Sequence, residues 1–579
     1  MKCSIYYHRK NKKNVIPITF LAIFFSLTTS GQNNSPYLFE ESHSPTQTAF
    51  IQQMLRPESK MRNNYLNNPA LLHQMIVDER YFFIGNPQQD TGEKNAVFLT
   101  FENSTGEHKG DYLPYEGKKF RDFSVRAHGY TRSNRSTFLG KGYFVTGKHK
   151  SYDWNTLRYA DLYWPYIVAD STGGDMSYEK YNILCAYSFR TNDLSIGVSG
   201  EFTGDFAYRQ NDPRIENITT WLTLKTGAAY TYKDCIFSAG IEYMRHRQHM
   251  DLHHFRTGQF AGFFIEYGFG MFDYIYSPIF RSMKQQQHMN DYGISLAFNS
   301  NPSKPLRMNT KMKYNYNLMT TEENNYKLNL YKGITHQLMF NYGMLWNNNV
   351  WGVGFFTDVE TSNKKGRENL FERYISAEID GVNVYDYKKI GHQDRYGLDV
   401  INGNADIKIS RFFRKKYAFS LLGGIHYFMR DETYSEYDYQ IKNGLITPSA
   451  GAEVNYNNRS YDLTVKGTWG HRTSVNNKYK VGINMEKHTE FQHAFTPYAY
   501  YANNADILTF EITASKHFPF GNIGIQAQML YTKGKRLNDV FYDPARYNAT
   551  MPAISRNTIS LTPGIHNATW AKVALFAVF

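Results

Sequence analysis

The sequence predicts an all-β fold, a transmembrane antiparallel β-barrel of about 16 to 18 strands that follows a small N-terminal leader. Aromatic residues form 16% of the chain, led by 47 Tyr and 41 Phe, although the mean hydropathy is −0.56. No stretch approaches the roughly 18 consecutive apolar residues of a membrane-spanning helix. Instead, many segments alternate apolar with polar residues, as strands do between lipid and water. A large tyrosine-rich secreted β-sandwich is the alternative fold, and barrels of about 14 or 20 strands are also compatible.

The first 31 residues have the pattern of a secretion signal. Five basic side chains precede an apolar run from Val15 to Leu27, and small residues come directly after the run. The run is short and contains Pro17, so it does not suit a membrane span. We therefore expect cleavage after Gly31 and, together with the barrel, a location in the outer membrane of a Gram-negative bacterium.

The charge balance of the mature chain is mildly basic. The signal holds five of the 65 Lys and Arg residues and no acid, which leaves 60 basic against 52 acidic residues, a formal charge of +8. Such an excess suits a lumen tuned for anions, contact with lipopolysaccharide phosphates, or scattered solvated lysines. Because basic residues alternate with apolar ones along strands instead of forming a patch, no nucleic-acid partner is expected.

Two cysteines remain after the signal, Cys185 and Cys235. Both fall in predicted strands. A disulfide formed in an oxidising compartment and two separate thiols facing lipid or lumen are both compatible with the sequence.

Residues 32–95 differ in pattern from the rest of the chain and are expected to form a partly helical leader. Ser44 and Pro45 precede an apolar stripe at helical spacing, which is a typical helix start. Asn68 and Pro69 form a turn signal before a second short apolar segment. The leader could fold into the barrel as a plug or stay on the periplasmic side.

The barrel is expected to cover residues 96–579, and its clearest strand is 307–318. Over twelve residues, Met, Thr, Tyr and Leu side chains alternate with basic and amide side chains. This length and regularity match one tilted crossing of a bilayer. The polar set predicts a wet, basic lumen wall. Its members are Arg307, Asn309, Lys311, Lys313, Asn315 and Asn317.

The connections also have the pattern of a barrel. Residues 450–469 predict a complete hairpin, and short turns are expected at 191–193 and 233–234. Longer polar stretches, among them 284–291 and 362–368, are expected to be extracellular loops. Short connections that alternate with long ones are typical of periplasmic turns and extracellular loops.

Residues 571–579 predict a membrane-facing strand. One face of this strand is uninterruptedly apolar and ends in Phe579. A strand this apolar would promote aggregation at the edge of an open sheet, so the pattern favours a closed barrel.

Four histidines lie within nine residues, namely His246, His249, His253 and His254. Imidazoles at this density could bind a divalent metal or a haem iron. Their spacing matches no closed zinc site, however, and the segment is expected to run from a strand into a loop, where alternate residues diverge. A polar loop is the preferred interpretation, so no metal or cofactor is predicted and the four histidines are only candidate ligands.

The sequence carries no catalytic signature that we recognise. The pattern Gly-x-Ser-x-Gly is absent, and residues 197–200 have the wrong spacing within a predicted strand. A triad assembled from distant loops would escape sequence inspection. We therefore expect no enzyme, and a barrel hydrolase is the least favoured function.

The first half of the predicted barrel contains five short motifs that together resemble a known family. They are residues 161–166, Asp170-Ser171, residues 200–202, Tyr208-Arg209 and residues 212–214. These motifs resemble an uncharacterised outer-membrane β-barrel family from Bacteroidetes. The last strand resembles, through Phe579, the signal read by the barrel-assembly machinery. Asn68-Pro69-Ala70 is more weakly similar to the long-chain fatty-acid transporter family.

The main resemblance implies an accessory role beside TonB-dependent systems that take up nutrients or iron compounds. Together with the polar strand face, it predicts a channel or accessory uptake component for small hydrophilic solutes or iron compounds. The alternative is a non-transporting surface or structural barrel whose loops bind a ligand. Outer-membrane lipid and lipopolysaccharide are expected partners in either case.

Overall fold

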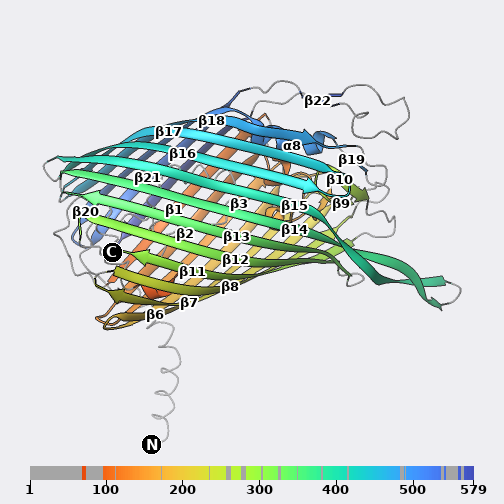
Figure 1. The fold of residues 1–579 in the computed structure, drawn as a ribbon, viewed down its shortest axis with the longest axis horizontal. Helices are drawn as coiled ribbons and strands as arrows, with labels where there is room; N and C mark the ends of the chain where they lie inside the picture. The colour runs from red at the N-terminus through yellow and green to blue at the C-terminus, as the bar shows by residue number, and fades with distance from the viewer. Residues whose placement is uncertain are drawn as a thin grey trace, which may run out of the picture.

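The chain forms a closed antiparallel β-barrel of 18 strands (Figure 1). This computed structural model confirms the fold class and the strand number expected from the sequence. The described residues are 68–72, 95–110, 113–170, 172–233, 235–255, 263–274, 282–300, 304–323, 328–348, 350–379, 382–413, 416–458, 460–482, 488–489, 491–535, 540–542, 559–561 and 566–579. The expected signal at 1–31 and the expected helix near Ser44 lie outside these residues.

Each barrel strand pairs with the next barrel strand along the chain. The barrel strands are β1 (Asn95–Lys109), β2 (Lys119–Arg132), β3 (Ser136–Lys150), β5 (Met176–Thr191), β6 (Leu194–Arg209), β7 (Arg214–Tyr232), β8 (Cys235–His253), β11 (Ser282–Asn299), β12 (Leu306–Glu323), β13 (Leu328–Asn347), β14 (Trp351–Ile379), β15 (Val382–Phe413), β16 (Tyr417–Tyr434), β17 (Tyr439–Asn457), β18 (Tyr461–Lys480), β20 (Ala505–Phe518), β21 (Gly521–Gly534) and β24 (Asn567–Val578). The hairpin predicted at 450–469 is present in β17 and β18.

The barrel closes where β24 pairs with β1. The register places Phe98 opposite Val578, and the backbones of Val97 and Phe579 exchange two hydrogen bonds of 2.8 and 3.0 Å. Val573 and Leu575 are exposed on the outer face of β24, as expected for a lipid-facing strand.

One end of the barrel carries only short turns. We call it the short-turn end, and it also holds residue 579 (Figure 1). The predicted turns at 191–193 and 233–234 are both there. Asn192 and Lys233 take positive φ angles of 43° and 44°, which suits the tight hairpins of twisted strands.

The opposite end, the loop end, carries the long connections. Two of the expected loops are wrong: residues 284–291 lie within β11 and residues 362–368 within β14. These strands have 18 and 29 residues. About 9 to 11 residues suffice to cross a bilayer, so the strands continue beyond the lipid, where both faces can be polar.

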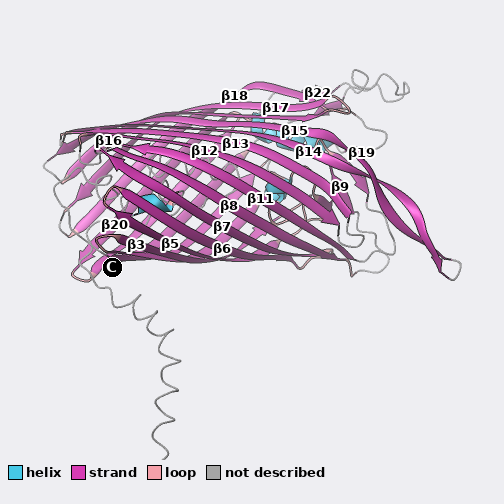
Figure 2. Ribbon diagram, turned by 60° about the horizontal axis from the view of Figure 1, so that its bottom comes forward, coloured by secondary structure: helices cyan, strands magenta, loops and turns pink. Residues whose placement is uncertain are grey.

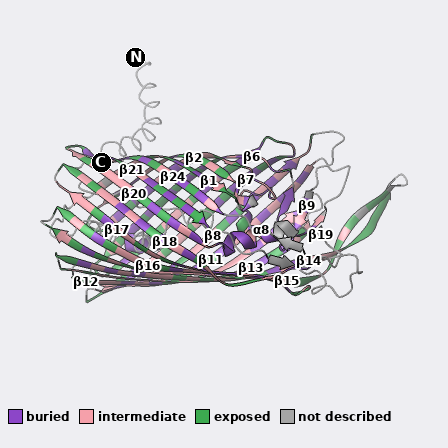
Figure 3. Ribbon diagram, turned by 90° about the horizontal axis from the view of Figure 1, so that it is seen from above, coloured by how far each residue is buried: buried purple, intermediate pink, exposed green. Residues whose placement is uncertain are grey.

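Burial alternates along the strands between an inner and an outer face (Figure 3). On β5, for example, Tyr178, Lys180 and Asn182 are buried, whereas Tyr181 and Ile183 are exposed. The exposed set is rich in aromatic and aliphatic side chains on almost every strand. An outer face of this composition suits lipid, and the inner face is predominantly polar.

Segments from the long connections fold into the loop end of the barrel, where Figure 2 shows the helices inside the ring of strands. These segments are η2 (Pro114–Glu116), α7 (Ala160–Tyr163), β4 (Val168–Asp170), β9 (Phe263–Glu266), β10 (Met271–Tyr274), β19 (His488–Thr489) and α8 (Phe491–Ala502). β4, β9, β10 and β19 form a small sheet. A further pair, β22 (Val540–Tyr542) with β23 (Ile559–Leu561), belongs to the last connection. Within the described residues, no helix is long and apolar enough to cross a membrane.

A short segment of the expected leader lies inside the short-turn end. It contains the 3-10 helix η1 (Pro69–Leu71), which packs on β5, β6 and β7. Leu71 and Leu72 share an apolar cluster with Phe98 and Phe576 from the inner wall. The barrel proper begins at Asn95, one residue before the expected boundary.

The hairpin of β14 and β15 projects far beyond the rest of the loop end (Figure 1). The last β13 partner of β14 is at Glu368, and the last β16 partner of β15 is at Tyr396. Beyond these residues the two strands form a ribbon that pairs with no other described strand. We call residues 370–391 the projecting ribbon.

Candidate functional site in the lumen

The inner face of β12 carries the side chains that the sequence proposed as lumen-lining. Asn309, Lys311, Lys313 and Asn315 are buried on the inner face, while Met312 and Tyr314 are exposed on the outer face. Asn317 is partly buried on the same inner face. Arg307 sits at the short-turn end, where its Nε donates to the Lys304 carbonyl.

Neighbouring strands supply acids to this basic row. Lys313 Nζ lies 3.1 Å from Glu242 Oε2, and Lys225 Nζ lies 3.3 Å from the same oxygen. Lys313 reaches Glu242 across β11, where Gly293 leaves the space open. Asn317 donates to Asp291 at 3.5 Å. The lumen wall is therefore mixed in charge rather than basic.

Lys311 differs from its neighbours. Its side chain is only 5% exposed, and within the described residues it forms no hydrogen bond or ion pair. A buried ammonium without a counter-ion is costly, so the position is suited to an anion.

Charge pairing continues around the rest of the inner wall. Lys572 contacts Glu102 at 2.7 Å across the closing strands, and Lys408 contacts Glu453 at 2.9 Å. Glu511 accepts hydrogen bonds from two glutamines of β21. The middle of the lumen is thus polar, and its charges are largely compensated by neighbours.

At the loop end, a buried ion pair holds the segment that contains α7 and β4. Arg209 Nη2 lies 2.8 Å from Asp170 Oδ2, and both side chains are fully buried. Arg209 also donates to the Pro213 carbonyl, while Asp170 accepts from the backbone N–H groups of Thr172 and Gly173. This arrangement ties the in-folded segment to β6 and to the β6–β7 connection.

Polar side chains of the wall also satisfy the backbone of the same segment. Lys364 Nζ donates to the carbonyls of Leu162 and Trp164 at 3.0 and 2.6 Å. Asn217 donates to the Thr156 carbonyl at 2.8 Å. Buried carbonyls need such partners, so the inner face is built to hold this segment in place.

Two carboxylates organise the aromatic packing beside it. Glu368 accepts from Tyr434 at 2.7 Å and pairs with Arg395 at 2.9 Å. Glu432 accepts from Trp164 Nε1 at 2.7 Å and from Tyr396 at 2.8 Å.

A cavity of about 20 Å³ remains beside Glu432 and Arg430, which is room for about one water molecule. The space directly beside these two side chains is therefore packed by protein.

At the short-turn end, the η1 segment is held by backbone contacts. Asn68 Nδ2 donates to the Ala239 carbonyl at 3.0 Å, and Ser188 Oγ donates to the Ala70 carbonyl at 3.3 Å. Gly197 faces the backbone of Pro69 so closely that any Cβ would overlap it. Both ends of the lumen thus contain chain segments.

The four candidate histidines are separated by the pleat of β8. His246 faces inward, is fully buried and contacts the Tyr163 hydroxyl. His249 and His253 lie on the other face, where His253 pairs with Asp251. His254, just beyond the strand, lies 3.2 Å from Asp212. Among the described residues, no three His, Cys, Asp or Glu side chains gather as a metal site.

Both cysteines are free thiols. Cys185 lies on β5 and Cys235 on β8, with β6 and β7 between them in the sheet. The structure therefore places them as two separate thiols.

The model of the Family of unknown function (DUF6850) matches residues 94–567. The chain belongs to this family. The matched region begins one residue before β1 and ends at the first residue of β24, so the family model spans the barrel of this DUF6850 member up to its last strand. No curated protein matches the chain.

Several solved outer-membrane barrels are similar to this DUF6850 chain at low identity. BauA, the ferric preacinetobactin receptor from Acinetobacter baumannii, is 8% identical, with 83% of this chain and 80% of that chain covered and a TM-score of 0.36. The FrpB iron transporter from Neisseria meningitidis is 9% identical, with 83% and 81% covered and a TM-score of 0.37. The outer membrane transporter YddB from Escherichia coli is 8% identical, with 84% and 81% covered and a TM-score of 0.38. Likeness at this level carries no information about a ligand.

Sequence reasoning missed the residues that hold the in-folded segments to the inner wall. Asp170 and Arg209 stand within the short motifs, but nothing in their spacing indicates that they pair. Glu368 and Glu432 carry no sequence signal, because the tyrosine and tryptophan side chains that they bind come from distant segments.

Proposed function

We propose that the chain is an outer-membrane uptake barrel for a small hydrophilic solute, with a lumen that is closed at rest and opens when its own in-folded segments move. The observation that carries the proposal is the polar, charge-paired inner wall that continues beneath these segments. A wall that only had to be filled would be more stable with apolar side chains. About 16 to 18 strands also enclose enough space for an aqueous channel.

An anionic solute fits the wall best. Three lysines, at positions 225, 311 and 313, face two acids, Glu242 and Asp291, on the inner faces of β7, β8, β11 and β12. Among the described residues, Lys311 forms no ion pair, and Glu242 is the acid whose charge acts on it. The Lys311 side chain would contact a carboxylate or phosphate inside the lumen, in the half of β12 nearer the short-turn end.

Planar bilayers test the proposal. The intact chain is expected to conduct weakly, and Lys364→Met is expected to conduct more, because it removes the two hydrogen bonds to the carbonyls of the α7 segment. Lys365→Met is the matched control, since Lys365 is exposed on the other face of β14. Lys311→Glu is expected to move the reversal potential in a salt gradient toward cation preference. Absence of conductance and solute flux in all folded variants would sink the proposal.

The second candidate is a surface barrel that binds a partner without transporting it. The projecting ribbon favours this function, because it exposes Tyr374, Ile375 and Ile390, and no other strand in the described part of the chain pairs with its edges. Replacing residues 371–389 by a two-residue turn separates the two candidates. Retained solute flux supports transport, whereas absence of flux in every variant leaves surface binding.

The same proposal includes the partners expected from the sequence. The exposed apolar outer face suits outer-membrane lipid. The barrel-assembly machinery would recognise Phe579, the last residue after β24 of the closing pair β1 and β24. A TonB-dependent system would be the partner that supplies the solute or receives it. No catalytic step is part of the proposal.

A further inference from the structure

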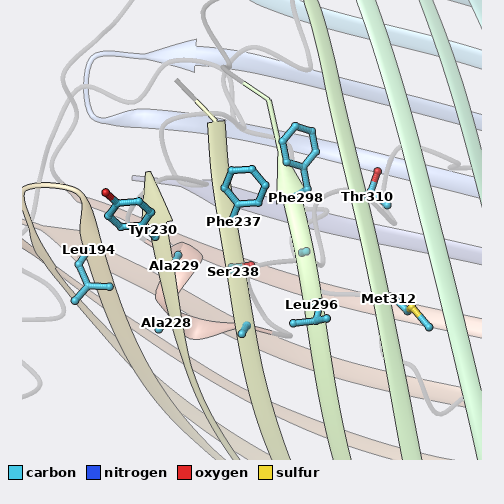
Figure 4. Close-up of a pocket in the computed structure, with 12 residues that line it drawn as sticks. Leu194, Ala228, Ala229, Tyr230, Phe237, Ser238, Leu296, Phe298, Thr310 and Met312 are labelled. Carbon is cyan, nitrogen blue, oxygen red and sulfur yellow. The ribbon is translucent and has the colours of Figure 1, made fainter. Parts of the chain in front are cut away.

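The outer wall carries a shallow apolar hollow of about 560 Å³ near the short-turn end (Figure 4). We call it the outer hollow. It extends over β6, β7, β8, β11 and β12 on the face that meets lipid. Its size lies within the range of about 300 to 1,000 Å³ that is typical of ligand pockets.

Strand register explains the hollow. Ala228 of β7 lies opposite Ala239 of β8 on the outer face, so two methyl groups form the floor. In the next row toward the turns, Tyr230 lies opposite Phe237. The centroid of the Phe237 ring lies 5.3 Å from the centroid of the Phe298 ring. The floor is therefore bounded by an aromatic ridge on its turn side.

Aliphatic side chains continue the lining of the hollow on both sides of the floor, with Leu194 on β6 and Leu296 and Met312 on β11 and β12. Leu296 and Met312 continue the floor row to β11 and β12, where they rise above the two alanines. The result is a shallow depression beside the aromatic ridge, and its lining is predominantly apolar, with Ser238 and Thr310 as its small polar members. Such a surface suits a hydrocarbon chain rather than a polar ligand.

A cation stands at the turn side of the aromatic ridge. Lys233 occupies the β7–β8 turn, and its Nζ lies 5.2 Å from the centroid of the Tyr232 ring. That ring is exposed on the outer face of β7. The ammonium is therefore available at the outer surface, beyond Tyr230, where the headgroup layer would begin.

We propose that the outer hollow binds one acyl chain of a phospholipid from the periplasmic leaflet, with the lipid phosphate at Lys233. The short-turn end of a bacterial barrel faces the periplasm, which places the hollow in that leaflet. The apolar hollow matches the acyl chain of a phospholipid, and the positive charge of Lys233 matches its negatively charged phosphate. The inference is independent of whether the lumen conducts.

Native mass spectrometry of the full chain in detergent tests this, with phosphatidylglycerol added as the probe. The intact chain is expected to retain one tightly bound lipid. The double variant Ala228→Leu/Ala239→Leu fills the floor and is expected to weaken retention about tenfold, a change equivalent to about 1.4 kcal/mol. Added leucine on a lipid-facing surface does not oppose folding, so the barrel should still assemble.

Lys233→Asn tests the headgroup contact. Asparagine tolerates the positive φ of this turn, so the charge is removed without disturbing the hairpin. Lipid retention is expected to fall about fivefold, because one basic side chain near an anionic headgroup strengthens binding by about this factor. Lys233→Arg should restore it.

Ala452→Leu is the matched control, because Ala452 lies opposite Leu421 on the outer face of β17. It should leave retention unchanged. Equal loss in this control would identify the bound lipid as nonspecific and would overturn the proposal. The proposal also fails if the floor variant retains lipid normally. Loss of a dimer instead of a lipid would assign the hollow to a second copy of the chain.

Discussion

The two ends of the barrel hold their inner chain segments in different ways. At the short-turn end, adjacent strands are joined by turns of a few residues, and one short segment around η1 fits against glycines. At the loop end, segments from distant parts of the sequence are tied to the wall by a buried ion pair, tyrosine hydroxyls and lysine-to-carbonyl bonds. The contrast indicates that the wall is a local structure, whereas its closure depends on contacts across the lumen.

Removing the buried ion pair between Arg209 and Asp170 should have the largest effect, because it should loosen the loop end and leave the wall intact. Arg209→Ala leaves the Asp170 carboxylate buried without its partner, which costs about 3 to 5 kcal/mol in comparable sites. Amide hydrogen exchange of residues 156–170 should accelerate strongly, while exchange in β6 and β7 should change little. Arg214→Ala is the control, since Arg214 is exposed at the same connection. Unchanged exchange after Arg209→Ala would show that the loop end does not depend on this pair.

At the short-turn end, one methyl group should be enough to displace the η1 segment. A Cβ at Gly197 would overlap the backbone of Pro69 and Ala70, so Gly197→Ala should weaken docking by about 1 to 3 kcal/mol. Chymotrypsin should then cleave at Leu71 or Leu72 in the folded barrel. Gly200→Ala is the control on the same strand, because its Cβ would meet only Leu224 at 3.7 Å. Equal protection of both variants would contradict the close fit.

Acidity should affect the loop end more than the wall. Burial raises the pKa of Glu266 in β9 well above its usual range. The docked state therefore holds a proton that the undocked state releases above about pH 4, and docking should weaken as the pH rises from there. Glu266→Gln should remove this dependence, which tryptophan fluorescence during urea titration at several pH values can measure. A steep pH dependence in the glutamine variant would assign it to another group.

The smallest effect is expected from the cysteines. Cys185→Ser with Cys235→Ser removes no disulfide, so stability should stay within about 0.5 kcal/mol. The heat-dependent gel mobility of the barrel should be the same with and without reductant. A reductant-dependent shift in the intact chain would contradict two separate thiols.

The same contrast explains which features the sequence could predict. The inner and outer faces of β12 are predictable from a period of two, since alternation along one strand needs no knowledge of its neighbours. Lys313 is therefore assigned to the inner face from sequence, but its partner Glu242 depends on the register of β8, β11 and β12. Polar stretches such as 284–291 resemble loops, because a strand that continues past the lipid loses its apolar face. Asp170 and Arg209 lie 39 residues apart, and no periodicity indicates such a pair.

The seam between β1 and β24 has a consequence for the timing of biosynthesis. The first strand of the barrel must wait for residues 567–578 before it acquires its second neighbour, while about 450 other residues are made. Until then, the growing sheet has two open edges, which invite pairing with other chains. Cells that produce this protein must therefore shield it throughout that interval, and the yield of finished barrels should depend more on this shielding than on the strength of any single contact within the wall.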